Sequence, residues 1–268
     1  MLTATLGGVI KDYRIKKRLS QLEVSLRIGW KDTTRLSKIE QGRVGVPSRV
    51  TVEKIMKALA LTKKEKADML MAANIVPTKK EAANTLQKLE AYLRNIPFPI
   101  ILFDFAWHVY FFNSLARELF HLTNKEYQFI VKKNLNWFEL QFGYDFLGKV
   151  HMRGGYLKSD LQPFKEYIVE HFKYGHEETI MEKGFQKMLA SLSQKSDEFR
   201  KLWAKTKPAT ENRFYDYEIN EFTSTWKGKK RTLTFHVYSV RPAFDFRFIF
   251  LIHQPADWET TKFYPQEL

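Results

Sequence analysis

The sequence changes character near residue 80, and this change limits what the chain can fold into. The first 80 residues hold 18 lysines and arginines against 7 aspartates and glutamates, but only Tyr13 and Trp30 of the 40 aromatic residues. The other 188 residues hold 26 basic and 23 acidic residues, and about one in five is aromatic. Such a sharp change in charge and aromatic content is not expected within one domain, so we expect two domains with different partners.

The basic, aromatic-poor part has the composition of a domain that binds a polyanion. The net charge of +14 lies mostly there, and lysine and arginine gain free energy by displacing counterions from phosphates. Judged by charge alone, a solvated basic helical domain without a nucleic-acid partner is an equal alternative.

Composition excludes several other classes. The chain has no cysteine, which excludes disulfides, iron–sulfur clusters and thiolate metal sites and is typical of a reducing cytoplasm. The longest apolar run, residues 98–112, is broken by Asp104 and His108, and the first residues do not form a basic head followed by an apolar segment. We therefore expect no membrane span, no secretory leader and a cytoplasmic location.

The sequence also gives no catalytic or metal-binding pattern. A nucleophile elbow, a phosphate-binding glycine loop and an HExxH motif are missing, so we do not expect an enzyme. His171 and His176, followed by Glu177 and Glu178, have metal-binding side chains, but a five-residue gap on one helix puts the two imidazoles on different faces. We expect surface histidines there and no metal.

Residues 6–74 are typical of five short amphipathic helices with explicit start and stop signals. Ser20 with Glu23, and Thr62 with Glu65, form capping boxes, and Ser48 opens another helix. Glycines at 29 and 42 follow the second and third helices, where a glycine commonly ends a helix.

The order of these signals resembles a known family. Ser20-Gln21, Val24-Ser25, Gly29-Trp30 and the run from Leu36 to Gly42 resemble the helix-turn-helix domains of the lambda-repressor/Cro type, the xenobiotic-response-element family. One residue more than is usual in that family separates the glycine from the apolar residue of the third helix. The register of the base-contacting positions is therefore open to a shift of one residue.

The resemblance implies that the third helix enters the major groove of double-stranded DNA. Arg35 is the expected direct reader, because a guanidinium can pair bidentately with guanine. Gln21 would reach a phosphate or support a base contact, and Arg43 would hold the DNA backbone. The implied DNA-binding residues are Gln21, Thr33, Thr34, Arg35, Ser37, Lys38 and Arg43.

A connecting helix is predicted after this domain. Thr78 and Glu81 form a capping box, and leucines at 86, 89 and 93 share a face that would pack on the second domain or on a partner chain. We expect a helix-turn-helix DNA-binding domain at residues 1–76, the connecting helix at 77–96 and a ligand-binding domain at 97–268.

The second domain has strand patterns at both ends: continuous apolar runs such as 100–103, and alternation at 214–222 and 231–241. Strands are predicted at 100–103 and 107–112, followed by a short helix at 115–120 capped by Asn113, and again at 214–222, 231–241 and 246–252. Helices at about 164–172, 181–192 and 196–204 form an insertion between these ends. We expect an all-α helix-turn-helix domain followed by an α+β PAS-like domain with an antiparallel sheet and a helical insertion.

The opening of this domain and the segments 134–138 and 197–204 resemble the MmyB-like regulators, which join a PAS-related ligand-binding domain to this type of DNA-binding head. The resemblance implies a fatty-acid-like or other small apolar ligand. Aromatic residues and a few polar ones are the candidate ligand contacts, although most aromatic residues of a domain are simply core. The candidates are Trp107, Phe111, Trp137, Phe142, Phe199, Trp203, Arg213, Phe235, His236, Tyr238 and Arg241.

Together these features predict a transcription regulator that binds a palindromic operator as a homodimer and responds to an apolar effector. The alternative is a DNA-binding protein whose PAS-like domain only mediates dimerisation or protein contacts, with a filled interior. Occupancy of a cavity in the second domain would separate the two.

Overall fold

The computed structural model describes residues 5–143, 158–175, 180, 183–209, 218–226 and 229–262. The chain divides into two compact units. The N-terminal unit consists of Met1–Pro77 together with Arg241–Arg247, and the C-terminal unit consists of Thr78–Val240 and Phe248–Leu268. The predicted connecting helix is present as α6 (Lys79–Asn95), with the Thr78–Glu81 capping box, and it belongs to the C-terminal unit.

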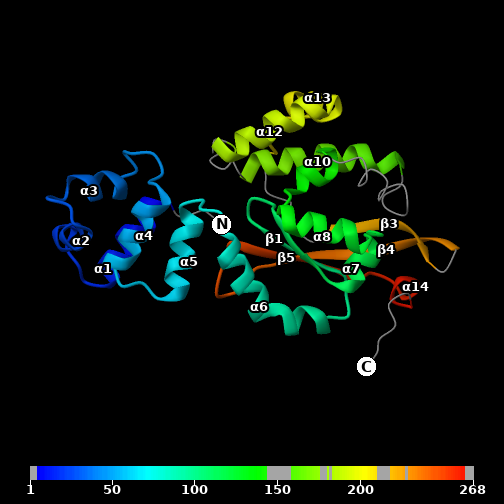
Figure 1. Ribbon diagram of the computed structural model, residues 1–268, viewed down its shortest axis with the longest axis horizontal. Helices are drawn as coiled ribbons and strands as arrows, with labels where there is room; N and C mark the ends of the chain where they lie inside the picture. Colours follow the sequence, from blue (N-terminus) through cyan, green and yellow to red (C-terminus); the bar gives the residue numbers. More distant parts are fainter. Residues whose placement is uncertain are drawn as a thin grey trace. The chain divides into compact units, whose positions relative to one another are not determined.

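Five helices build the N-terminal unit (Figure 1). The predicted start signals are confirmed: Ser20 and Thr62 form capping boxes with Glu23 and Glu65, and the side chain of Ser48 accepts a hydrogen bond from the backbone of Thr51. The helices are α1 (Leu6–Lys16), α2 (Gln21–Ile28), α3 (Thr34–Glu40), α4 (Arg49–Ala58) and α5 (Lys63–Ala72).

One apolar core joins these five helices. Ile10, Val24, Leu36 and Ile55 are fully buried in it and come from four different helices. Where α1 crosses α3 there is no room for a side chain, because a Cβ atom on Gly7 would lie 2.5 Å from the carbonyl oxygen of Ile39. Glycine at this position therefore lets α1 pack directly on the backbone at the end of α3.

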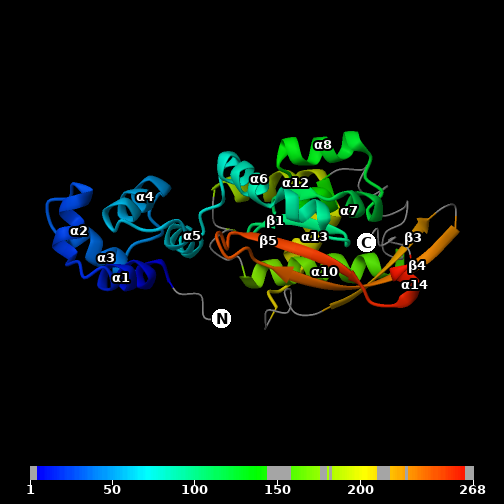
Figure 2. The ribbon, with the colours of Figure 1, turned by 90° about the horizontal axis from the view of Figure 1, so that it is seen from below.

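A five-stranded antiparallel sheet is the centre of the C-terminal unit (Figures 1 and 2). Its strand order is β2-β1-β5-β4-β3, and β3 pairs over its whole length with residues 229–237 of the longer β4. The predicted fold class is confirmed: a helical helix-turn-helix region is followed by an α+β domain with an antiparallel sheet. The strands are β1 (Ile100–Asp104), β2 (Val109–Phe112), β3 (Glu218–Trp226), β4 (Lys229–Val240) and β5 (Phe248–Pro255).

Helices cover both faces of this sheet. Leu86, Leu89 and Leu93 of α6 pack with Ile100, Leu102, Phe248 and Phe250 on one face. Of the two partners considered for these leucines, the second domain is therefore the one that the structure shows. The neighbouring residues Ile101 and Phe103 point to the opposite face, where α7 (Ser114–Leu119) and α8 (Asn124–Lys133) pack.

The helical insertion follows the π-helical turn η1 (Glu139–Gly143) and lies between β2 and β3 in the chain. Apolar residues of its helices form a separate core with Trp107 and Phe138. Ile168, Val169, Phe172 and Phe199 are fully buried in this core. The helices are α10 (Lys158–Gly175), α12 (Lys183–Lys195) and α13 (Asp197–Lys205), and the side chain of Ser196 caps α13.

The start of β2 differs from the prediction, which placed Trp107 at the first position of the strand. Trp107 has a φ of +66° and belongs to the turn, and β2 begins at Val109. The carboxylate of Asp104 accepts hydrogen bonds from the backbone N–H groups of Ala106 and His108, both at 2.9 Å, and this network lengthens the turn.

Three further elements were not predicted: α8, the π-helical turn η1 and the C-terminal α14 (Trp258–Thr261). Residues 214–217 of the predicted strand at 214–222 lie outside the described residues, and β3 starts at Glu218.

Candidate nucleic-acid interface and ligand-binding region

Helices α2 and α3 are joined by residues 29–33, and the geometry of this connection starts at a glycine. Gly29 has a φ of 88°, a left-handed conformation that side chains rarely adopt, and it ends α2. The backbone N–H of Trp30 then donates to the carbonyl oxygen of Ser25 at 2.9 Å. Ser25 itself is fully buried, and its small side chain leaves room for α2 to pack closely on its neighbours.

Helix α3 has one buried side and one exposed side. Leu36 is fully buried and Ile39 is 4% exposed, and both belong to the core of the N-terminal unit. Thr34, Arg35 and Lys38 are exposed, and Thr33 and Ser37 are partly exposed. The apolar side therefore fixes the helix, while hydroxyl and cationic side chains face solvent.

Arg35 is held by an aromatic side chain. Its guanidinium carbon lies 4.8 Å from the centre of the Trp30 ring, within the range of a cation–π contact. The carboxylate of Asp32, which lies between them in sequence, accepts a hydrogen bond from the backbone N–H of Thr34 at 2.7 Å. This hydrogen bond lowers the pKa of Asp32 and caps the start of α3.

Glu40, at the end of α3, is part of a hydrogen-bonded network. Arg14 donates to its two carboxylate oxygens, from Nε at 2.7 Å and from Nη2 at 2.9 Å, and this bonding raises the pKa of Arg14. Gln21 donates from Nε2 to Oε2 of Glu40 at 2.8 Å. The network links the start of α2 and the end of α3 to α1, and it orients the side chain of Gln21. The contact of Gln21 with DNA stays a prediction.

Positive charge prevails on the exposed side of this region. Lys31, Arg35, Lys38 and Arg43 are all exposed, whereas Glu40 is neutralised by Arg14. Arg43 follows Gly42, which has a φ of 66°, and its backbone N–H donates to the carbonyl oxygen of Lys38 at 2.9 Å. Such a surface releases counterions when it meets phosphates.

Helices α2 and α3 are joined by a tight turn, and α3 has a buried apolar side and an exposed basic side. This arrangement defines a helix-turn-helix domain of the DNA-binding type. The comparison with protein families agrees, because residues 5–69 match the model of a helix-turn-helix domain. This class consists typically of regulators without catalytic activity. A search of curated proteins finds no match to the chain. In the part of the chain that the structure describes, no helix is long and apolar enough to cross a membrane.

The structure brings five of the candidate ligand contacts together in the core of the insertion. Trp107 and Phe199 are buried there, and the partly buried rings pack against this core. Phe138, which the prediction did not include, lies among them: its ring centre is 5.4 Å from Trp107, 6.0 Å from Phe199 and 5.8 Å from Trp203. The five candidates are Trp107, Trp137, Phe142, Phe199 and Trp203.

The other candidates lie elsewhere. Phe111 packs on the α6 face of the sheet, whereas Phe235 is buried on the α7 face with Leu119. His236 and Tyr238 pair with Gln254 and Ile252 of β5 and share one face of β4.

Of the two candidate arginines, the structure describes only Arg241, which does not lie among these aromatic residues. Arg241 belongs to the segment Arg241–Arg247 of the N-terminal unit, and its Nη1 donates to the carbonyl oxygen of Phe246 at 2.6 Å. Arg213 lies outside the described residues.

Two lysines border the aromatic core of the insertion. Lys165 donates to both carboxylate oxygens of Glu198 at 2.8 Å, and its Nζ lies 5.1 Å from the Phe142 ring. Lys173 donates to the carbonyl oxygens of Trp203 and Thr206, and burial lowers its pKa. These cations are engaged by protein groups at the edge of the cluster.

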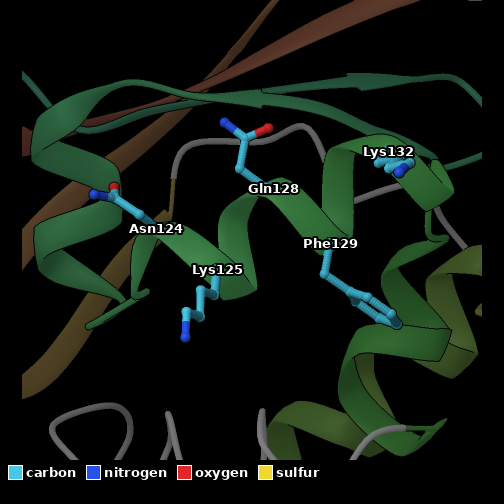
Figure 3. Close-up of a pocket in the computed structure, with 5 residues that line it drawn as sticks. All are labelled: Asn124, Lys125, Gln128, Phe129 and Lys132. Carbon is cyan, nitrogen blue, oxygen red and sulfur yellow. The ribbon is translucent and has the colours of Figure 1, made fainter.

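A shallow hollow of about 420 Å³ lies along α8 (Figure 3). Figure 3 shows Lys125 and Phe129 pointing to one side of the helix and Gln128 to the other. The lining residues are Asn124, Lys125, Gln128, Phe129 and Lys132.

Helix α8 starts at a capping box of Thr123 with Glu126. The same sequence signal predicted other helices of the chain, so it could also have revealed this one.

The histidines considered for a metal do not form a described site. Nδ1 of His171 lies 2.9 Å from the carbonyl oxygen of Tyr167, one turn earlier on α10. His176, Glu177 and Glu178 lie outside the described residues, and no group of three potential ligands occurs among the residues that are described.

Proposed function

We propose that the chain is a sequence-specific transcription regulator that binds a palindromic DNA operator as a homodimer and whose C-terminal unit senses a small apolar ligand. The exposed basic side of α3 carries the first part of this proposal. Its hydroxyl and cationic side chains fit base edges and phosphates, and its apolar side holds the helix rigidly on the core. Two copies reading half-sites one helical turn apart give an operator with twofold symmetry.

Titration of the full-length protein with duplex DNA at increasing salt tests DNA binding. Lysine and arginine contacts to phosphates make the logarithm of the binding constant fall linearly with the logarithm of salt concentration. Tight binding to a selected sequence, with this salt dependence, supports the proposal. Failure to bind any duplex at low salt would refute it.

Arg35→Ala and Arg43→Ala separate base reading from backbone contact. We expect Arg35→Ala to relax the sequence preference, with a loss of about 1–3 kcal/mol of discrimination at one base pair. Arg43→Ala should weaken binding to all sequences alike and lower the salt slope by about one unit. Equal losses on specific and random DNA for both variants would contradict these roles.

The ligand-sensing part is supported by the concentration of aromatic side chains in the insertion, next to Lys165 and Lys173. Aromatic residues line many apolar ligand sites. An acidic head group at the edge of this cluster would have to replace the present partners of Lys165 or Lys173, which are Glu198 and two backbone carbonyl oxygens. A fatty-acid-like molecule has this combination of an apolar chain and a carboxylate. Its binding would change the spacing of the two heads and thereby the affinity for the operator.

One observation favours a second candidate function, in which the C-terminal unit only mediates dimerisation or protein contacts. Phe138, Phe172 and Phe199 are fully buried, and Phe172 stacks on Phe185 with ring centres 5.1 Å apart. Aromatic rings that pack directly against one another are expected in a filled interior that has no space for a ligand.

Native mass spectrometry of the full-length protein distinguishes the two. A retained small molecule, or one fatty acid bound per chain with a matching change in operator affinity, supports sensing. A ligand-free dimer whose mass and operator affinity do not respond to a series of fatty acids supports the dimerisation function.

A further inference from the structure

We propose that Trp30 is a positioning residue for Arg35, and that the stack of these two side chains makes the protein prefer a guanine in each half-site of its operator. This inference rests on the proposed DNA-binding function and adds the base that is read and the residue that enforces the reading.

Trp30 is a rigid platform. It stands directly after the left-handed Gly29, and its backbone N–H is bonded to Ser25. One side of its indole packs against the core of the N-terminal unit. A side chain that is fixed by the core on one side and by the turn at its backbone has little freedom to move.

The Trp30 ring restricts the side chain of Arg35. Its side chain is exposed, and its guanidinium carbon lies 4.8 Å from the Trp30 ring centre. Among the residues that the structure describes, no carboxylate forms an ion pair with Arg35, and the nearby Asp32 is engaged by the backbone of Thr34. The indole face is thus the contact that restricts the guanidinium.

A stack of this kind leaves the hydrogen-bonding edge of arginine available. A guanidinium has five N–H groups that point outward in its plane, and contact with a single aromatic ring cannot occupy all of them. Guanine presents two neighbouring acceptors, O6 and N7, in the major groove, and these accept a planar pair of N–H groups. A guanidinium that already rests against a fixed ring loses less freedom when it makes this pair.

The length of the turn fits this role. Residues 31–34 separate Trp30 from Arg35, so the turn brings the aromatic ring beside the first turn of α3. The connection of residues 29–33 between α2 and α3 therefore carries the aromatic support for the reading arginine.

The test uses full-length Trp30→Leu and Trp30→Phe. Leucine keeps apolar packing against the core but removes the π face, whereas phenylalanine keeps a smaller π face. Both keep the net charge, so affinity for random duplexes and the salt slope should stay as in the parent protein. Selection from a library of random duplexes then measures the preference for guanine at the position that Arg35→Ala relaxes.

We expect Trp30→Leu to lower that preference about tenfold, close to Arg35→Ala, and Trp30→Phe to retain most of it. In an Arg35→Ala background, Trp30→Leu should have no further effect on the preference. In the free protein, the side-chain NMR signals of Arg35 should lose their ring-current shift in Trp30→Leu. This last measurement needs no DNA.

Three results would overturn the inference while leaving DNA binding intact: an unchanged guanine preference in Trp30→Leu, an equal loss of affinity on all sequences, or the same additional loss in the Arg35→Ala background. Unfolding midpoints of the variants show whether an equal loss comes from an unfolded head, in which case Trp30→Phe decides. A parent protein that binds no duplex refutes the proposed function itself, and the inference falls with it.

Discussion

Arg14 and Glu40 form a two-point ion pair in which Nε and Nη2 of the guanidinium lie 2.7 Å and 2.9 Å from the two carboxylate oxygens. Their side chains are only 12% and 3% exposed. The pair joins α1 to the last residue of α3, so the position of the exposed side of α3 depends on a buried electrostatic contact as well as on apolar packing.

Removal of one partner of this pair should be strongly destabilising. Glu40→Ala leaves the Arg14 guanidinium buried without its carboxylate, and we expect the free energy of unfolding of the N-terminal unit to fall by about 3 kcal/mol. Chemical denaturation followed by circular dichroism measures this loss, since the unit is helical. In the double variant with Arg14→Ala, the losses should be clearly less than additive.

The exposed pair of Arg94 and Glu90 on α6 is the matched control. Their side chains are 70% and 52% exposed, so Glu90→Ala should change the free energy of unfolding by less than about 0.5 kcal/mol. Equal effects of Glu40→Ala and Glu90→Ala would show that the buried pair is unimportant.

Two adjacent glycines of α1 should respond in opposite ways to alanine. In Gly7→Ala the new Cβ would meet the carbonyl oxygens of Ile39 and Glu40 at 2.5 Å and 2.7 Å, and backbone atoms cannot give way without moving α3. We expect a loss of about 3 kcal/mol or more in the free energy of unfolding, with weaker DNA binding.

In Gly8→Ala the nearest atom is the side-chain oxygen of Thr5 at 3.3 Å. Alanine is the better helix former by about 0.5–1 kcal/mol, so this variant should be neutral or slightly more stable. Thermal unfolding of both variants checks the pair, and similar midpoints for the two would contradict the close approach of α1 to α3.

His253 on β5 should make the C-terminal unit sensitive to mild acid. Burial lowers the pKa of its ring from 6.5 to about 4, so the folded ring stays neutral where an unfolded chain would take up a proton. The contribution of the neutral His253 ring to the free energy of unfolding is therefore complete above about pH 6.5. It is lost as the pH falls toward 4, and the free energy of unfolding then decreases by roughly 3 kcal/mol in total.

Tryptophan fluorescence during urea unfolding measures this effect, because five of the six tryptophans follow residue 80. The free energy of unfolding of the parent protein should fall between pH 6.5 and 4 more steeply than that of His253→Leu. Parallel pH profiles for the two proteins would show that His253 is protonated in the folded state.

Phe138 tests whether the aromatic core of the insertion is filled. It is fully buried, and its ring contacts Trp107, Phe172 and Phe199. In a packed core, Phe138→Ala should cost about 3–5 kcal/mol, whereas Tyr92→Ala, at a side chain that is 71% exposed, should cost little. A loss below about 1 kcal/mol for Phe138→Ala would indicate a space that a ligand can fill.

Local signals allowed much of the fold to be predicted. The capping boxes at Ser20, Thr62 and Thr78 and the cap at Asn113 depend on side chains within three residues of one another, and all four are present in the structure. The same signal at Thr123 marks α8, which was overlooked. Alternating apolar residues likewise predicted the strands to within a few residues.

Features that depend on distant residues could not be predicted in this way. The left-handed Trp107 is held by a distant segment, because its carbonyl oxygen accepts a hydrogen bond from the backbone N–H of Trp137 at 2.9 Å. Alternation likewise does not indicate which of several clusters a ring joins. Phe111 and Phe235 therefore lie on opposite faces of the sheet although both read as candidate contacts. At the candidate interface, Arg35 was evident from its place on the third helix, but its contact with Trp30 needs the folded turn.

The absence of a side chain at Gly7 has a consequence for changing what the protein recognises. Because the backbone of α1 rests on the carbonyl oxygens of Ile39 and Glu40, the tilt of α3 cannot be adjusted without rebuilding its support. New operator preferences are therefore more accessible by exchanging Thr34, Arg35 and Lys38, whose exposure lets them vary at little cost in stability. A retargeted protein would keep the scaffold and alter only this outward surface.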